Sequence, residues 1–250
     1  MPGNLTVEQL NAGIAAGDID TVVVAFADAQ GRLVGKRVSA RLFQEEVLPH
    51  GAEACNYLLS VDVDMNTVDG YAMSSWETGY GDMMLRPDVS TLRCIPWLPG
   101  SALVMADLTW ENGEPVVQSP RDILNRQRQR LADRGLVAFS GTELEFIVFD
   151  DTYRDAWAKG YRDLTPSTDY NVDYDLLASG RLEPLLRDIR LSMDGAGLYT
   201  EGVKGECNLG QQEIAFRYAE AQETADQHAI YKNGAKAIAE HHGKSLTFMA

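Results

Sequence analysis

Four glutamates form two closely spaced pairs in the second half of the sequence. Glu143 and Glu145 lie two residues apart in an otherwise apolar run whose composition favours a strand. Because side chains alternate along a strand, both carboxylates are expected to point the same way. Glu206 and Glu213 flank a segment whose Asn and Gly residues suit a tight connection between two further strands. The pattern predicts that four carboxylates converge from three neighbouring strands.

Such a cluster of acids has a definite chemical preference. Carboxylates that share a site repel one another unless a cation lies among them, and hard oxygen ligands suit magnesium or manganese. A lone Glu-x-Glu is more often the polar face of a half-exposed strand. The second pair, however, adjoins apolar strand residues at 214–216, where unpartnered acids are costly. A metal site is therefore favoured.

Several motifs, in one order, resemble the glutamine synthetase family. They are ELEFIVFD at 143–150, the pattern E-G-x-x-x-E-x-x-x-G-Q-x-E-I at 201–214, and HGKSLTFMA at 242–250. The segment at 81–108 also looks like the family's link between its small N-terminal domain and its catalytic domain. The sequence resembles the N-terminal part of proteins of that family. Among its branches, it most resembles the ligases that make γ-glutamyl amides from ethanolamine or polyamines.

The resemblance implies roles for the four glutamates. Glu145, Glu206 and Glu213 match the ligands of the metal nearer glutamate and the amine, and Glu143 matches a ligand of the nucleotide-side metal. The remaining ligands of that second metal follow this region in the family. Magnesium or manganese is the cation expected at both positions.

The resemblance also implies an ATP site. Glu201 matches a residue that contacts the nucleotide, and Tyr218 falls where the family places an aromatic ring against the nucleoside. Simple strand packing explains Tyr218 equally well.

A long irregular segment at 62–88 is interpreted as a surface loop, and loops of this length are commonly functional. In the family this region reaches the active site of a neighbouring subunit, and ammonia-using members carry Asp-Gly-Ser-Ser there. Here three residues separate Gly70 from Ser74, so the sequence departs from the family's ammonium-binding motif. The apolar and aromatic residues nearby could instead line a site for an amine that bears carbon, which favours an organic amine over ammonium as the substrate. The possible amine-site residues are Asp69, Tyr71, Met73 and Trp76; the last three alternatively only anchor the loop. The catalytic residues themselves stay unassigned.

Local patterns predict an α+β fold. By resemblance, residues 1–112 form a small β-grasp-like domain with the long loop, and residues 113–250 form the first part of a catalytic domain with a curved antiparallel sheet and helices. Expected helices lie at 5–16, 43–48, 120–134, 183–195 and 224–242, and expected strands at 21–28, 32–38, 53–62, 101–108, 143–149, 198–204, 213–218 and 245–249.

Two segments have competing interpretations. The helix at 120–134 carries five arginines, which form either a phosphate-binding patch or the solvated face of a surface helix. The polar segment at 151–179 lacks periodicity and is expected to be a loop over the active-site face.

Composition narrows the function classes. The net charge of −15 argues against nucleic acid and anionic membranes as partners. Three widely spaced cysteines indicate neither a disulfide framework nor a zinc site, and a reducing cytoplasm fits best. The sequence lacks both an apolar run long enough for a membrane span and a recognisable signal peptide.

Together these observations predict an ATP-dependent ligase that joins the γ-carboxyl of glutamate to a small amine through γ-glutamyl phosphate. Glutamine synthesis from ammonia is the alternative, and a non-catalytic relative with a binding or structural role is an alternative of another class. The family implies a ring-type homo-oligomer, such as a dodecamer, with shared active sites. Because family members are considerably longer, the chain is expected to be a fragment and, by itself, inactive.

Overall fold

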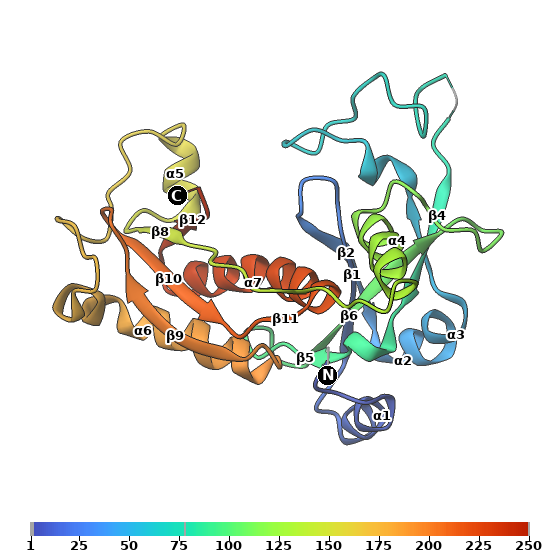
Figure 1. Ribbon diagram of the computed structural model, residues 1–250, viewed down its shortest axis with the longest axis horizontal. Coiled ribbons are helices and arrows are strands. Elements are labelled where there is room, and N and C mark those ends of the chain that lie inside the picture. The colour runs from blue at the N-terminus through green and yellow to red at the C-terminus, as the bar shows by residue number, and fades with distance from the viewer. Residues whose placement is uncertain (1–2, 78, 250) are drawn as a thin grey trace. The chain divides into compact units, whose positions relative to one another are not determined.

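The structure is a computed structural model that describes residues 3–77 and 79–249, and its fold is mixed α/β (Figure 1). The chain divides into two compact units. The first comprises residues 1–138 and 221–229, and the second comprises residues 139–220 and 230–250. The division into these units does not fall at residues 112 and 113, where the boundary between two domains was expected. The expected domain boundary stays a prediction.

The first unit is built on a mixed sheet in the order β2-β1-β6-β4-β3, with β5 paired to β6. Strands β1 and β6 are parallel, whereas β1 and β2 form the expected antiparallel hairpin. The strands are β1 (Thr21–Ala27), β2 (Leu33–Ser39), β3 (Ala52–Cys55), β4 (Asp82–Pro87), β5 (Arg93–Cys94) and β6 (Ser101–Thr109).

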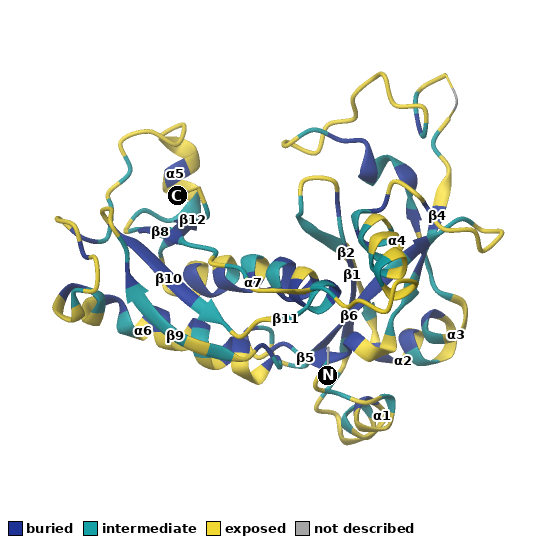
Figure 2. Ribbon diagram, in the orientation of Figure 1, coloured by how far each residue is buried: buried dark blue, intermediate teal, exposed yellow. Residues whose placement is uncertain are grey.

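Apolar side chains of the central strands form the core of this unit, and β6 is buried along most of its length (Figure 2). Val24 and Val104 are fully buried there, as is Phe43 from the neighbouring helical segment. The helices are α1 (Val7–Ala16), α2 (Ala40–Leu42), a π-helical turn (Phe43–Val47), α3 (Leu48–His50) and α4 (Pro120–Ala132). The expected cap of α1 is confirmed, because Thr6 and Gln9 form a capping box.

The long loop is shorter than expected. Residues 62–88 were expected to be irregular throughout, but β4 begins at Asp82 and pairs with both β3 and β6. The reason is alternation: Met83 and Leu85 point into the core and are fully buried. Strand β3 also ends early, at Cys55, because a 3₁₀ turn follows it.

Arg121 departs from both interpretations of the arginine-rich helix. Its guanidinium is buried and forms ion pairs with Asp88 at 2.7 Å, with Asp226 at 3.0 Å and with Asp107. Burial lowers the pKa of Arg121, but the hydrogen bonds and charges of these acids outweigh it and raise the pKa overall. Arg121 therefore ties α4 to β6 and to the start of helix α7 (Ala221–His241) within the first unit.

The second unit contains a curved four-stranded antiparallel sheet in the order β12-β8-β10-β9 and a separate pair of strands, β11 and β7. Helix α6 lies alongside β9, and Tyr231 of α7 packs against Phe216 of β10 with ring centroids 4.6 Å apart. The elements are β7 (Phe139–Ser140), β8 (Phe146–Phe149), α5 (Tyr153–Ala158), α6 (Leu176–Gly195), β9 (Thr200–Gly205), β10 (Gln211–Phe216), β11 (Ala219–Glu220), α7 (Ala221–His241) and β12 (Ser245–Thr247).

The segment expected to be a loop at 151–179 contains helical structure. Thr152 and Asp155 form a capping box that starts the six-residue helix α5. Asp175 caps α6, which begins at Leu176 and is therefore longer at its N-terminal end than expected.

Among the helices of the described residues, none combines the length and the apolar character that crossing a membrane requires.

Candidate functional site

Strand register explains why distant acids meet in the second unit. Antiparallel pairing places Glu213 of β10 directly opposite Lys204 of β9. On the other side, Gln212 pairs with Phe146 of β8, so the same register continued by one residue brings Glu145 opposite Glu213. A row of three charged residues therefore crosses β9, β10 and the position just before β8. Glu206, two residues beyond Lys204, adds a further carboxylate on the same face.

Three of the four expected acids come together. Carboxylate oxygens of Glu145, Glu206 and Glu213 all lie within 4.8 Å of one another. Glu213 is buried, and Glu145 and Glu206 are half-buried. We call these three residues the carboxylate trio. Its oxygen donors fit a divalent cation, because three acids at this spacing need compensating positive charge.

The chain itself supplies positive charge at this point. The Lys204 ammonium contacts the Glu206 carboxylate and lies 2.9 Å from Glu213 Oε2. Partial desolvation lowers the pKa of Lys204, but the hydrogen bond and the charge of Glu213 outweigh it, so the pKa is raised overall. Lys204 was not predicted from the sequence; its signal was the two-residue spacing from Glu206, which places both side chains on one face.

Gln211 is a second residue that sequence reasoning missed. It lies two residues before Glu213, and its side-chain amide donates a hydrogen bond to Glu145 Oε2. The bond fixes which way this carboxylate points, as partners of metal ligands commonly do. Its signal was the Gln-x-Glu spacing on β10, which places Gln211 and Glu213 on the same face of the strand.

The connection between Glu206 and Glu213 is confirmed as a tight turn between β9 and β10. Gly210 has a φ of 69°, and a Cβ atom there would lie 2.6 Å from the Val148 carbonyl oxygen. Its N–H donates to Thr168 Oγ1 at 2.6 Å. Only glycine satisfies both the backbone angle and the close approach, so this residue fixes where the turn begins its return as β10.

Glu143 does not join the trio. The strand expected at 143–149 begins later, at Phe146, because the chain leaves β7, which pairs with β11, and only then enters β8, which pairs with β10. Residues 141–145 cross between the two sheets without a ladder of their own, and Glu143 is exposed there. Its role as a ligand of a second metal stays a prediction.

The two expected nucleotide residues occupy exposed positions near the ends of strands. Gly202 pairs with Ala215 and Thr200 pairs with Phe216, so Glu201 between them is the additional residue of a β-bulge. Bulges redirect side chains and occur frequently beside active sites. Tyr218 is exposed and contacts Phe139 edge-on, with ring centroids 6.1 Å apart.

The proposed amine-site loop belongs to the first unit, and its residues differ in setting. Asp69, Tyr71 and Trp76 are exposed, Trp76 at 80% of its surface. Met73 instead packs against the core, and the Asn56 side-chain amide donates to its carbonyl oxygen at 3.3 Å. This packing favours the anchoring interpretation for Met73, whose role at an amine site stays a prediction.

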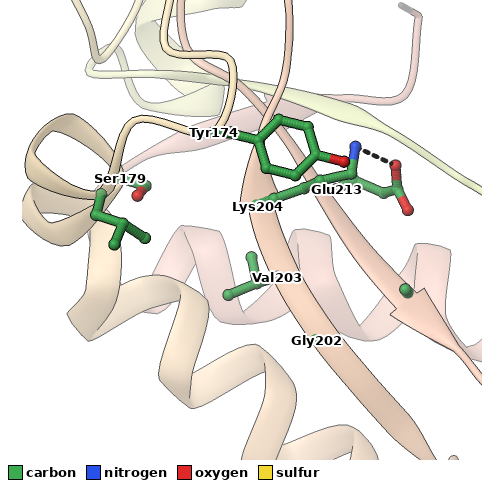
Figure 3. Close-up of a pocket in the computed structure, with 9 residues that line it drawn as sticks. Tyr174, Ser179, Gly202, Val203, Lys204 and Glu213 are labelled. Atoms are coloured by element: carbon green, nitrogen blue, oxygen red, sulfur yellow. Dashed lines mark ion pairs between the residues drawn. The ribbon is translucent and has the colours of Figure 1, made fainter.

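A pocket of about 330 Å³ adjoins the carboxylate trio within the second unit (Figure 3). It lies beside β9 and the start of α6. Lys204 lines it, and the Lys204 Nζ atom lies 5.2 Å from the centroid of the Tyr174 ring. Gly202, Val203 and Ser179 complete much of the wall, which leaves room beside the lysine.

Comparison with known protein families identifies the class of protein. The family model for the catalytic domain of glutamine synthetase matches residues 117–250, which is more than half of the chain. This chain therefore belongs to the glutamine synthetase family.

Among similar proteins is the gamma-glutamylethanolamide synthetase of Streptomyces coelicolor, which is 65% identical over 246 residues, covering 98% of this chain and 53% of that protein. A glutamate–isopropylamine ligase of a Pseudomonas species is 33% identical, covering 93% of this chain and 51% of that protein. The glutamine synthetase of Thermococcus kodakarensis is 32% identical, covering 91% and 46%. The chain thus spans about half the length of the curated relatives it matches.

Solved structures agree with this assignment. The complex of GmaS with ADP superposes with a TM-score of 0.79 at 26% identity, covering 96% of this chain and 51% of that one. GmaS without ligand gives a TM-score of 0.76, also at 26% identity, covering 95% and 52%.

Proposed function

We propose that this chain forms part of an ATP-dependent ligase that joins the γ-carboxyl group of glutamate to a small organic amine. The observation that carries the proposal is an assembled carboxylate trio in a chain 65% identical to a gamma-glutamylethanolamide synthetase. Three carboxylates whose oxygens lie within 4.8 Å of one another repel each other. A protein that did not bind a metal would have no reason to keep all three as acids.

The reaction needs two balanced steps. A γ-carboxylate oxygen of glutamate attacks the terminal phosphorus of ATP, which releases ADP and leaves γ-glutamyl phosphate. The amine nitrogen then attacks the acyl carbon, the carbon–oxygen bond breaks with its electrons going to phosphate, and the nitrogen loses a proton. Phosphorylation is required because a carboxylate otherwise has oxide as its leaving group.

Residues of this chain take complementary parts in the proposal. Glu145, Glu206 and Glu213 hold a magnesium or manganese ion, which neutralises phosphate charge when bound. Glu201, redirected by its bulge, contacts the nucleotide. Tyr218 has an exposed face that is free to stack on the nucleoside, and Glu143 contributes to a second metal together with later residues.

The amine is selected, in this proposal, by exposed residues of the first unit's loop. Tyr71 and Trp76 present aromatic faces that can contact carbon or a cation, and Asp69 can attract the protonated amine. The loop is further proposed to act in a neighbouring subunit's site within a ring-type homo-oligomer. A β-grasp-like first domain and a cytoplasmic location also remain predictions.

The first test is phosphate release by the complete protein with ATP, glutamate and magnesium, comparing ethanolamine, isopropylamine, polyamines and ammonia. We expect release and a γ-glutamyl amide product, seen by mass spectrometry, with an organic amine and little with ammonia. Preference for ammonia would instead make the protein a glutamine synthetase. Absence of release with every acceptor would favour a non-catalytic relative.

Two variants separate the roles within that test. Glu213→Gln should reduce kcat/KM by about 100-fold or more for every acceptor, because a group that holds transition-state charge is lost. Trp76→Ala should change the ratio between acceptors and leave the stability within about 0.5 kcal/mol, since its side chain is exposed. Equal losses for all acceptors in Trp76→Ala would contradict the loop's selective role.

A further inference from the structure

The space among the carboxylate trio already holds a cation that belongs to the chain. Lys204 contacts two of the three acids, Glu206 and Glu213. These are acids that the proposed metal ion would use. An ammonium ion that makes these contacts repels a divalent cation placed among the same carboxylates. The lysine and the metal therefore oppose one another at this site.

We propose that Lys204 is a tethered counter-cation: it occupies the carboxylate trio in the metal-free protein, competes with the divalent cation and is displaced when the metal binds. This inference rests on the proposed metal site and adds to it a residue that sets the strength of binding. It also gives the metal-free protein a defined arrangement of three neighbouring acids.

The structure provides a place for the displaced side chain. Lys204 lies on β9, at the edge of the four-stranded sheet, and borders the pocket of about 330 Å³. The ammonium is already 5.2 Å from the centre of the Tyr174 ring, whose face accepts cations. Rotation of the flexible four-carbon stem is enough to exchange the acids for the pocket, without movement of the strand.

The electrostatic consequence has a definite sign. In metal-free protein, removal of Lys204 leaves Glu213, which is buried, beside two other acids without a partner. In metal-bound protein, the same removal abolishes a repulsion. Loss of the lysine must therefore weaken the metal-free fold and strengthen metal binding, whereas an ordinary surface ion pair would affect neither by much.

Direct metal binding by the complete protein tests the inference. Protein stripped with a chelator is titrated with Mn²⁺, and free Mn²⁺ is counted by electron paramagnetic resonance. Lys204→Met, which keeps the apolar stem, should bind about tenfold more tightly, equivalent to about 1.4 kcal/mol. Lys204→Arg keeps the charge and should stay within about threefold of the wild type.

The matched control is Lys244→Met. The side chain of Lys244 is exposed to the same degree, 29% against 30% for Lys204. Its Nζ atom lies 2.5 Å from Oδ1 of Asp150, an acid that does not belong to the trio. Its removal should leave Mn²⁺ affinity unchanged. In thermal unfolding with chelator, Lys204→Met should melt below the wild type, and saturating Mn²⁺ should close that gap. For variants that unfold when stripped, chelator competition from the loaded protein gives the same comparison.

Two results separate this inference from the metal site beneath it. If Glu213→Gln loses Mn²⁺ but Lys204→Met binds it no more tightly than the wild type, the lysine is not a competitor and the inference is overturned. If Glu213→Gln and Glu145→Gln both bind Mn²⁺ as the wild type does, the trio is not a metal site and the proposed function loses its support.

Discussion

Gln211 shows how a residue that would not touch a metal can decide whether one binds. Its amide donates to Glu145 Oε2, the one acid of the trio that Lys204 does not pair with. Without this hydrogen bond the carboxylate is free to rotate away from Glu213. The position of Glu145 thus depends on a neighbour on another strand.

We therefore expect Gln211→Ala to weaken Mn²⁺ binding by about 10- to 100-fold, the usual effect of removing a partner of a metal ligand. Titration of the complete, chelator-stripped protein provides the measurement. Gln129→Ala is the control, because Gln129 bonds to Asp133 on the exposed surface of α4. Unchanged affinity in Gln211→Ala would mean that Glu145 needs no positioning.

Sequence reasoning found the acids but not the residues around them. Three of the four predicted acids do share a site. They could be predicted because carboxylates in apolar strands are conspicuous in a sequence. Lys204 and Gln211 are ordinary strand residues, and their importance depends on register, which pairs Lys204 with Glu213. Local patterns do not specify register, least of all where the two partners lie far apart along the chain, as Gln211 and Glu145 do.

At the scale of elements, the turn between β9 and β10 holds Glu206 and Glu213 in relation to each other. Gly210→Ala should lower the free energy of unfolding by about 2 kcal/mol or more, because positive φ and a close carbonyl both oppose a Cβ atom. It should also reduce activity, since Glu213 follows closely. Denaturant unfolding of the complete protein measures the first effect.

The control for that change is another glycine of the same unit. Gly180 lies within α6, where a Cβ atom would meet nothing within 4 Å. Gly180→Ala should therefore stabilise the protein by about 0.5–1 kcal/mol through helix propensity. Similar destabilisation by both variants would contradict the specific role of the turn.

Strand β12 is held on β8 and also by the hydroxyl of Tyr153, which accepts a hydrogen bond from the Leu246 N–H at 3.3 Å. Burial raises the pKa of Tyr153 to about 12, although the backbone of Leu246 lowers it in part. The unfolded tyrosine loses its proton near pH 10. Between these values only the unfolded chain releases the proton, so this contribution to stability is lost as pH rises.

Tyr153→Phe should therefore lose less stability than the wild type on going from about pH 9 to about pH 11. Urea unfolding at both values measures the difference, and other tyrosines cancel in the comparison. An identical loss in both proteins would show that Tyr153 titrates alike in the folded and unfolded chains.

Elements were predicted where periodicity is long and were missed where it is short. Helix α1 and the β1–β2 hairpin were found from capping and alternation. Helix α5 has only six residues, and its capping box at Thr152 was its only clear signal. Strand β4 was lost inside a loop because its polar flanks obscured the alternation of Met83 and Leu85.

At the scale of the whole molecule, the proposed sharing of active sites between subunits makes a direct prediction. Asp69→Ala alters the loop of the first unit, and Glu213→Gln alters the trio of the second. If a site combines the loop of one subunit with the trio of its neighbour, mixed oligomers of two inactive variants contain some sites with both parts intact.

Random mixing of equal amounts should restore about one quarter of wild-type activity, since each half of a site is intact in about half of the subunits. Each variant refolded alone is the control, and a mass-tagged subunit verifies mixing. Verified mixed oligomers without recovered activity would place both parts in the same subunit.

The bulge at Glu201 limits how the length of this chain can change during evolution or in a designed library. The bulge already takes up one additional residue of β9, so a further residue added between Glu201 and Lys204 would turn Lys204 and Glu206 to the face opposite Glu213. An addition among the exposed residues 207–209 would only enlarge the connection. Insertions are therefore best sampled in the connection, whereas β9 tolerates changes of residue type but not of number.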